Sequence, residues 1–168
     1  MSGATEPIQE YFDEFVAAAD HPVVVVTTES AGRRAGCLVG FATQVSIDPR
    51  RYLVGLSKAN NTFRVAADAA ALAVHLLDAG QLPLARLFGS ESGDGLDKFT
   101  HCEWHPGPDG LPILSAAPGW FTGKILERYD FGDHVGVLLE PTTGQMRGGH
   151  PAVLRYGAVA HLTPGHPS

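Results

Sequence analysis

The side chains with the clearest binding chemistry lie in one hexapeptide, Ser57-Lys58-Ala59-Asn60-Asn61-Thr62. It follows an apolar strand pattern at residues 52–56, and the apolar spacing of residues 63–70 predicts a short helix directly after it. Free backbone N–H groups at a helix start, with a Lys and hydroxyl donors, suit a phosphate group. We therefore predict phosphate binding by Ser57, Lys58, Asn61 and Thr62. The alternative is a plain helix cap by Asn60 or Asn61, with Lys58 solvated.

The distribution of charge favours an anion at this hexapeptide. The whole chain has 12 basic and 18 acidic residues, yet residues 33–64 contain a single acid, Asp48. Half of the cations fall in that segment: Arg33, Arg34, Arg50, Arg51, Lys58 and Arg64. Thr43 and Ser46, near the end of the preceding strand, would add hydroxyl contacts. The net charge of -6 argues against a nucleic-acid partner.

Other motifs are weaker. Residues 119–125 mimic a phosphate-binding loop but are one residue short and lack the final Ser or Thr, and residues 89–93 carry Glu91 where a nucleophile elbow needs Ser. His101, Cys102 and His105 offer zinc ligands, but a structural site wants four and the other Cys is distant in sequence. We predict no metal site.

Length and composition indicate one globular domain. A chain of 168 residues buries a normal core without metal or disulfide support. No apolar run approaches the roughly 20 residues of a membrane span, and the first residues lack the pattern of a signal peptide. Cys37 and Cys102 are expected to be buried thiols rather than a bridge. We expect a soluble, cytoplasmic protein without a membrane partner.

The hydrophobic patterns predict many strands and few helices. A helix is expected over residues 8–19, a short one over 61–68, and another after a capping box at 78–81. His75, in an apolar strand, is expected to be a satisfied core residue. Buried strands are predicted at residues 23–28, 36–47, 52–56 and 72–77, and further strands at 101–104, 121–129, 134–140, 152–156 and 158–162. This pattern favours an antiparallel barrel with helical insertions over a βαβ sheet.

The chain resembles a known family at these same residues. Residues 36–49 and 56–66 resemble the core of the flavin reductase-like FMN-binding split barrel, and further matches follow in order at 72–77, 84–89, 97–99, 110–114 and 132–134. The resemblance covers roughly residues 20–162. It implies a mainly β, antiparallel split β-barrel that binds FMN, with a few short peripheral helices. The implied organisation is an N-terminal helix (1–19) packing on the barrel, the barrel domain (20–163) and a loose tail (164–168).

The resemblance also implies a function and its residues. It implies hydride transfer from NAD(P)H as co-substrate to FMN, with FAD as an alternative flavin. The implied flavin-binding residues are Gly40, Phe41, Ala42, Thr43, Ser46, Ser57, Lys58, Ala59, Asn61 and Thr62. His134, which follows the turn Gly132-Asp133, would lie beside the flavin and the nicotinamide. A homodimer and a partner monooxygenase that receives reduced flavin are implied as well.

One departure leaves a second function open. Many family members carry small hydroxyl residues where this chain has Leu38, Val39, Gly40 and Phe41. The alternative is therefore a non-catalytic split-barrel binding protein, either an FMN electron carrier or a binder of haem or a deazaflavin.

Overall fold

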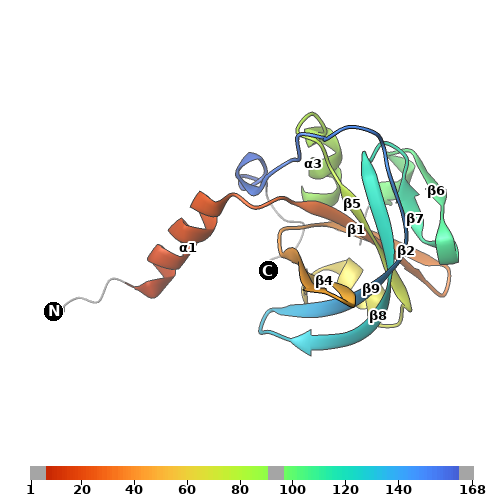
Figure 1. Ribbon diagram of the computed structural model, residues 1–168, viewed down its shortest axis with the longest axis horizontal. Coiled ribbons are helices and arrows are strands. Elements are labelled where there is room, and N and C mark those ends of the chain that lie inside the picture. The colour runs from red at the N-terminus through yellow and green to blue at the C-terminus, as the bar shows by residue number, and fades with distance from the viewer. Residues whose placement is uncertain (1–6, 91–96, 163–168) are drawn as a thin grey trace.

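The computed structural model describes residues 7–90 and 97–162, and the protein is mainly antiparallel β (Figure 1). Seven strands form one sheet in the order β2-β1-β5-β8-β9-β4-β3, and β6 pairs with β7. The strands are β1 (Val24–Ser30), β2 (Arg33–Val39), β3 (Ala42–Ile47), β4 (Arg50–Ser57), β5 (Ala71–Leu76), β6 (Trp104–Pro106), β7 (Pro112–Leu114), β8 (Gly119–Asp130) and β9 (His134–Met146). The helices are α1 (Ile8–Ala19), α2 (Asn61–Ala66) and α3 (Leu82–Ser90), with 3-10 turns η1 (Lys98–Thr100), η2 (Pro108–Gly110) and η3 (Tyr156–Ala158). The predicted fold class is confirmed.

The two edge strands of the large sheet are consecutive along the chain. Val39 ends β2 and Ala42 begins β3, so only Gly40 and Phe41 separate them. Three residue steps span at most roughly 11 Å, so the two edges lie close together and the sheet curls back on itself. No ladder joins β2 to β3 in the part of the chain that the structure describes. The curled sheet therefore stays open along this line, which we call the seam.

Both faces of the central strands are buried. Val24 and Val26 point into the curl with Val54, Leu72 and Leu139. The alternate residues of β1 point outward, where a second cluster contains Val23, Val25, Leu77, Phe88 and Leu114. Because strand side chains alternate between faces, a continuous run of Val is what a strand buried on both faces requires.

The polar groups of His75 are paired in the core, as expected from the sequence. The His75 side chain is fully buried. Its Nδ1 donates to the carbonyl of Val25 at 3.0 Å, and its Nε2 accepts from the backbone N–H of Leu114 at 3.1 Å. Burial lowers the pKa of His75 to about 4, so the neutral ring joins β5 to β1 and β7.

Helix α1 does not pack on the barrel, contrary to the expectation for residues 1–19. It has no buried residue, and Figure 1 shows it projecting from the sheet. Asp20 ends the helix in a left-handed conformation and accepts from the backbone N–H of Gly157 at 2.7 Å. The next residue, His21, accepts from the backbone N–H of Tyr156 at 2.8 Å. These contacts fix the end of α1 and leave the rest of the helix in solvent.

Several predicted strands differ in the structure. The strands predicted at residues 152–156 and 158–162 are wrong, because this segment crosses the ends of β1 and β5 and forms only isolated bridges and η3. The prediction at 101–104 contributes only Trp104 to β6. The stretch 36–47 is broken at the seam, and β3 is mostly exposed because it is an edge strand.

The predicted tail, residues 164–168, and most of the loop at 90–95 lie outside the described residues. None of the described helices is long and apolar enough to cross a membrane.

Candidate functional site

A pocket of about 450 Å³ opens beside the seam, between β3, β4 and the turn that joins β8 to β9. Its lining residues are Phe41, Ala42, Thr43, Leu53, Gly55, Phe131, Asp133 and His134. The elements meet here because β4 pairs with β3 on one side and with β9 on the other. Four residues singled out from the sequence, Phe41, Ala42, Thr43 and His134, are therefore brought together. We call this the seam pocket.

Two glycines lie beneath the aromatic walls of the seam pocket, and we call this pair the glycine floor; Gly55 also lines the pocket itself. Gly55 and Gly136 are direct partners in the β4–β9 ladder. A Cβ on Gly136 would lie 2.2 Å from the ring of Phe131, and a Cβ on Gly55 would lie 3.1 Å from the Cβ of Phe41. Aromatic side chains therefore lie directly over backbone. Glycine inside a strand marks a place where another group approaches the backbone closely.

His134 stands between an aromatic ring and a carboxylate. Its ring lies 4.8 Å from the ring of Phe41, measured between centroids. Its Nδ1 lies 2.8 Å from Oδ1 of Asp133, and this hydrogen bond lowers the pKa of the Asp133 carboxyl. Because a carboxylate only accepts, Nδ1 is the donor. In the neutral ring Nε2 is then an acceptor, and in the imidazolium it is a donor.

Lys58 is tied to the same turn. Its Nζ lies 2.9 Å from Oδ1 of Asp130, and its backbone N–H donates to the carbonyl of Asp133 at 2.9 Å. The Lys58 contact and the backbone N–H of Gly132 lower the pKa of the Asp130 carboxyl. Exposed ion pairs of this kind contribute little and exchange partners readily. The ammonium therefore lies near the turn that carries His134, with a carboxylate as its present partner.

The start of α2 uses its own residues as caps, which was the alternative reading of the hexapeptide. Asn60 Oδ1 accepts from the backbone N–H of Thr62 at 2.8 Å, and Ser57 Oγ accepts from that of Ala59 at 3.3 Å. The Thr62 side chain is 1% exposed, and its hydroxyl hydrogen-bonds the thiol of Cys37. Asn61 is half-buried. Thr62 thus faces the core, and the helix start is already occupied.

The cations that are close in sequence are spread in space. Arg34 stacks on the ring of Trp104 at 4.7 Å, near the β1–β2 turn. Arg51 pairs with Glu140 at 3.7 Å, at the opposite end of β4 from Lys58. A strand of this length separates its ends by roughly 20–25 Å. The expected cluster of positive charge is therefore not a single patch, because the strands carry its members to different ends of the sheet.

Two further predicted residues lie outside the seam pocket's lining. Gly40 faces away from it, since a Cβ there would lie 3.4 Å from Nε2 of His21 and 3.9 Å from the ring of Tyr156. Ser46 is half-buried at a β-bulge in β3. Leu38 and Val39, which replace the usual hydroxyl residues, are packed in the two core clusters. Of the departing residues, only Phe41 contacts the pocket.

Sequence reasoning missed the glycine floor and Phe131. The signal was present, because Gly55 and Gly136 interrupt apolar strand patterns, where glycine weakens a strand unless something needs the space. Phe131 directly precedes the turn Gly132-Asp133, but an aromatic residue before a turn is not by itself a signal for a binding site.

The suspected zinc ligands have other roles. His105 Nδ1 lies 3.2 Å from the hydroxyl of Ser115, and the Cys102 thiol contacts the carbonyl of Lys98. Within residues 7–90 and 97–162, no group of three or more His, Cys, Asp or Glu side chains is placed to hold a metal ion. Cys37 and Cys102 are free thiols.

The sequence matches known flavin reductases. A "Probable flavin reductase" of Rhizobium meliloti (strain 1021) is 29% identical over 152 residues, which are 90% of this chain and 47% of that protein. The "FMN reductase (NADH) RutF" of Ancylobacter novellus is 26% identical over 95% of this chain and 87% of its own length. The reductase component of a flavin-dependent trigonelline monooxygenase of Acinetobacter baylyi is 27% identical over 96% of this chain and 50% of its own. The chain thus spans about half the length of the first and third of these relatives.

A solved structure has the same fold. The NADH:FAD oxidoreductase SgcE6 of Streptomyces globisporus C-1027 superposes with a TM-score of 0.75 at 26% identity, covering 90% of this chain and 89% of that one. The sequence model for the flavin reductase like domain matches residues 17–162, which is most of the chain. This protein therefore belongs to the flavin reductase-like FMN-binding split-barrel family.

Proposed function

We propose that this protein is an NAD(P)H-dependent flavin reductase and that the seam pocket holds the isoalloxazine ring. The observation that carries the proposal is the floor of facing glycines, Gly55 and Gly136, flanked by Phe41 and Phe131. The names of the relatives support the activity, since they include an NADH-dependent FMN reductase and an NADH:FAD oxidoreductase.

The residues present fit a flat aromatic ring. Because Gly55 and Gly136 carry no Cβ, the side chains of Phe41 and Phe131 settle close against the backbone, and the pocket between them suits a planar group. Phe41 and Phe131 supply apolar walls, and His134 supplies the polar group closest to them. Few precisely placed polar groups in an aromatic-lined pocket are typical of cofactor sites.

Each side chain has a role in this proposal. Gly55 and Phe41 bind and orient the ring, and Phe131, which rests on Gly136 and is exposed at the rim, covers it from water. When bound, the flavin supplies a hydride-accepting ring. His134 Nε2 orients the nicotinamide by a hydrogen bond, as acceptor from its carboxamide while the imidazole is neutral. Lys58 exchanges Asp130 for the flavin phosphate, with Ser57 beside it; FMN is the flavin we favour, with FAD as the alternative.

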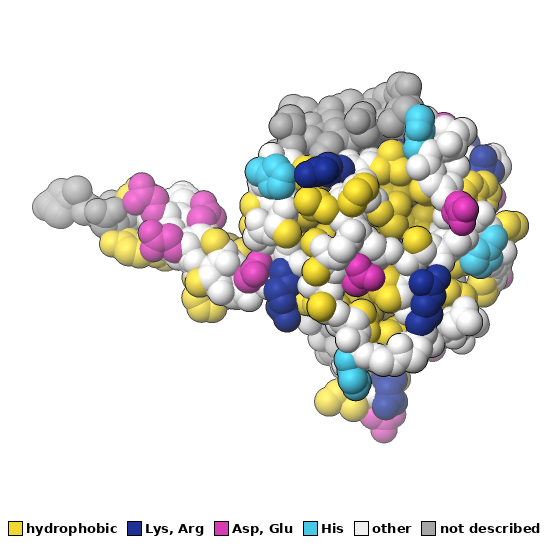
Figure 2. Space-filling view, turned by 90° about the horizontal axis from the view of Figure 1, so that it is seen from above, with side chains coloured by type: hydrophobic (Ala, Val, Ile, Leu, Met, Phe, Trp, Pro, Cys, Tyr) yellow, Lys and Arg dark blue, Asp and Glu magenta, His cyan; other side chains and the backbone are white. Residues whose placement is uncertain are grey.

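We include a homodimer in the proposal because of helix α1. Ile8, Tyr11, Phe12 and Phe15 are between 55% and 72% exposed. Figure 2 shows acidic side chains on one side of this helix and hydrophobic ones on the other. An amphipathic helix normally buries its apolar face, so a second copy of the chain would cover it.

A monooxygenase that receives reduced flavin is the proposed partner, by analogy with the relative that is a reductase component. We propose a cytoplasmic location, since NAD(P)H is found there and Cys37 and Cys102 are free thiols.

The experiment is an absorbance spectrum of the purified protein, followed by NADH and NADPH oxidation with FMN, FAD and riboflavin. The proposal expects flavin-dependent oxidation of at least one nicotinamide. A flavin spectrum without such oxidation would indicate the electron carrier instead. A Soret band would indicate haem. The absence of a flavin spectrum, of a Soret band and of flavin-dependent oxidation would contradict a flavin site.

A further inference from the structure

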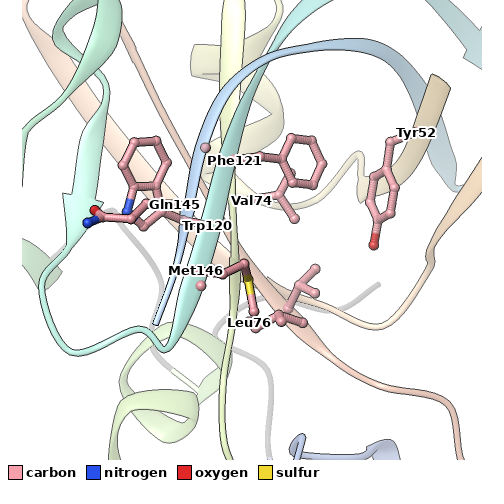
Figure 3. Close-up of a pocket in the computed structure, with 10 residues that line it drawn as sticks. Tyr52, Val74, Leu76, Trp120, Phe121, Gln145 and Met146 are labelled. Atoms are coloured by element: carbon pink, nitrogen blue, oxygen red, sulfur yellow. The ribbon is translucent and has the colours of Figure 1, made fainter. Parts of the chain in front are cut away.

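A second pocket, of about 430 Å³, lies inside the curled sheet (Figure 3). Its lining residues are Val24, Tyr52, Val74, Leu76, Gly119, Trp120, Phe121, Gly144, Gln145 and Met146. Tyr52 lies on β4 directly before Leu53, which lines the seam pocket. Because neighbouring strand residues point to opposite faces, the two pockets lie on opposite sides of β4. We call the second one the interior pocket.

The side chains that enter the interior pocket are almost all apolar. Figure 3 shows Val74, Leu76, Phe121 and Met146 on the Tyr52 side of β8, whereas the side chains of Trp120 and Gln145 point to the other side. Trp120 packs instead on a separate cluster of buried residues. Trp120 and Gln145 therefore contribute only backbone atoms to the interior pocket, as Gly119 and Gly144 do.

Of the described side chains that enter the interior pocket, only that of Tyr52 is polar. Its ring meets Phe121 edge to face, with centroids 5.1 Å apart and an interplanar angle of 79°. Within residues 7–90 and 97–162, no hydrogen-bond partner is found for its hydroxyl. Burial raises the pKa of Tyr52, so the hydroxyl stays protonated and can donate or accept a hydrogen bond.

We infer that the interior pocket binds a small hydroxylated aromatic compound, such as a bicyclic phenol. The volume is in the range of small-molecule sites, at roughly 300–1,000 Å³. Tyr52 and Phe121 offer an aromatic edge and face to a planar ring, and the Tyr52 hydroxyl pairs with the ligand's hydroxyl. Among the described residues, no Lys or Arg lines the pocket, which argues against a nucleotide or another phosphate as the ligand. The inference does not depend on the flavin reductase activity.

The test is calorimetric titration of the full-length protein with 2-naphthol and, as the matched probe without a hydroxyl, naphthalene. The wild type is expected to bind one 2-naphthol per chain. Loss of a neutral hydrogen bond corresponds to roughly 3- to 10-fold in affinity, so naphthalene should bind that much more weakly. The Tyr52→Phe variant should bind 2-naphthol more weakly by a similar factor, and it should bind 2-naphthol and naphthalene with equal affinity.

Filling variants identify the pocket. Leu76→Trp, or the milder Leu76→Phe if the first does not fold, should abolish binding of 2-naphthol. The matched control is Leu53→Trp. Leu53 follows Tyr52 on β4 but points to the opposite face, so the new side chain fills the seam pocket and should leave 2-naphthol binding unchanged. Saturating FMN should also leave it unchanged.

Three results would overturn the inference. The first is no saturable binding by the wild type. The second is loss of 2-naphthol binding when FMN is added or in the Leu53→Trp variant, because 2-naphthol would then occupy the seam pocket. The third is binding that appears only when Phe15→Glu dissociates a dimer, because a second copy would then fill the interior pocket.

Discussion

Gly55 and Gly136 face each other across the β4–β9 ladder, and each has an aromatic side chain lying over its Cα. Phe41 covers the first and Phe131 the second. The absence of a Cβ on either glycine lets the two aromatic side chains lie low, which leaves a pocket for a flat group between them. The proposed flavin site depends on this relationship more than on any charged residue.

Gly136→Ala should weaken flavin binding with little loss of stability. The new Cβ would meet the Phe131 ring, which is 62% exposed and can turn away, so the free energy of unfolding should change by less than about 1 kcal/mol. Turning away disrupts one wall of the seam pocket, so FMN affinity should fall severalfold. Gly148→Ala is the matched control, because no atom lies near its Cβ position. Fluorescence titration with FMN measures both, and equal affinities would contradict the glycine floor.

Lys58→Ala should lower the affinity for FMN more than the affinity for riboflavin, because riboflavin has no phosphate. A charge-assisted hydrogen bond is strong, but Lys58 is partly exposed, so we expect roughly 3- to 10-fold for FMN and little for riboflavin. Lys124→Ala, which removes an exposed Lys from β8, controls for net charge. Titration of both flavins checks the prediction. Equal weakening of the two ligands would exclude a phosphate contact by Lys58.

His134→Ala should lower the turnover of NAD(P)H or raise its KM, and it should change flavin affinity less than Lys58→Ala does. Hydride transfer needs the nicotinamide held against the flavin, and loss of an orienting hydrogen bond harms that geometry. Steady-state kinetics with each nicotinamide measures this. Unchanged kinetics in a folded variant would make His134 a turn residue only.

His75 should make stability depend on pH below neutrality. Its pKa is about 4 in the folded protein against 6.5 for the free side chain, so the unfolded chain binds more protons between those values. Its contribution is complete above pH 6.5 and is lost as pH falls towards 4, amounting to roughly 3 kcal/mol. His75→Gln keeps a donor and an acceptor but does not titrate. Urea unfolding of both proteins should therefore show a steeper loss for the wild type, and parallel curves would contradict this role.

Phe15→Glu should dissociate the proposed homodimer. Phe15 is 72% exposed on the apolar face of α1, so a charge there costs the monomer little but opposes burial against a second copy. Ala17→Glu, on another face of the same helix, is the control and should remain dimeric. Light scattering measures the mass. A monomeric wild type at working concentration would remove the dimer from the proposal.

The sequence predicted the architecture well because strand patterns are local. The Val23–Val26 run and the apolar stretches that begin β9 and fill β4 are local signals that need no tertiary information. The C-terminal segment was mispredicted because its apolar residues pack across strand ends, which gives the same local pattern as a strand. The exposure of α1 could not be predicted either, since an amphipathic stripe does not tell which surface covers it.

The candidate site was only half visible in the sequence. Phe41, Ala42, Thr43 and His134 line one pocket, and their contact with a flavin stays a prediction. Thr62 was misleading, because a hydroxyl near a helix start can turn inward, as it does here towards Cys37. The apparent cation cluster dispersed because antiparallel strands carry sequence neighbours to opposite ends of a sheet.

The most direct test of the central claim is the rate of NAD(P)H oxidation with FMN at limiting concentration, measured side by side for the wild type and Gly136→Ala. The account predicts oxidation by the wild type that requires FMN, and a clearly lower rate for the variant that recovers as FMN is raised. No flavin-dependent oxidation by the wild type, or identical FMN dependence in the two proteins, would contradict it.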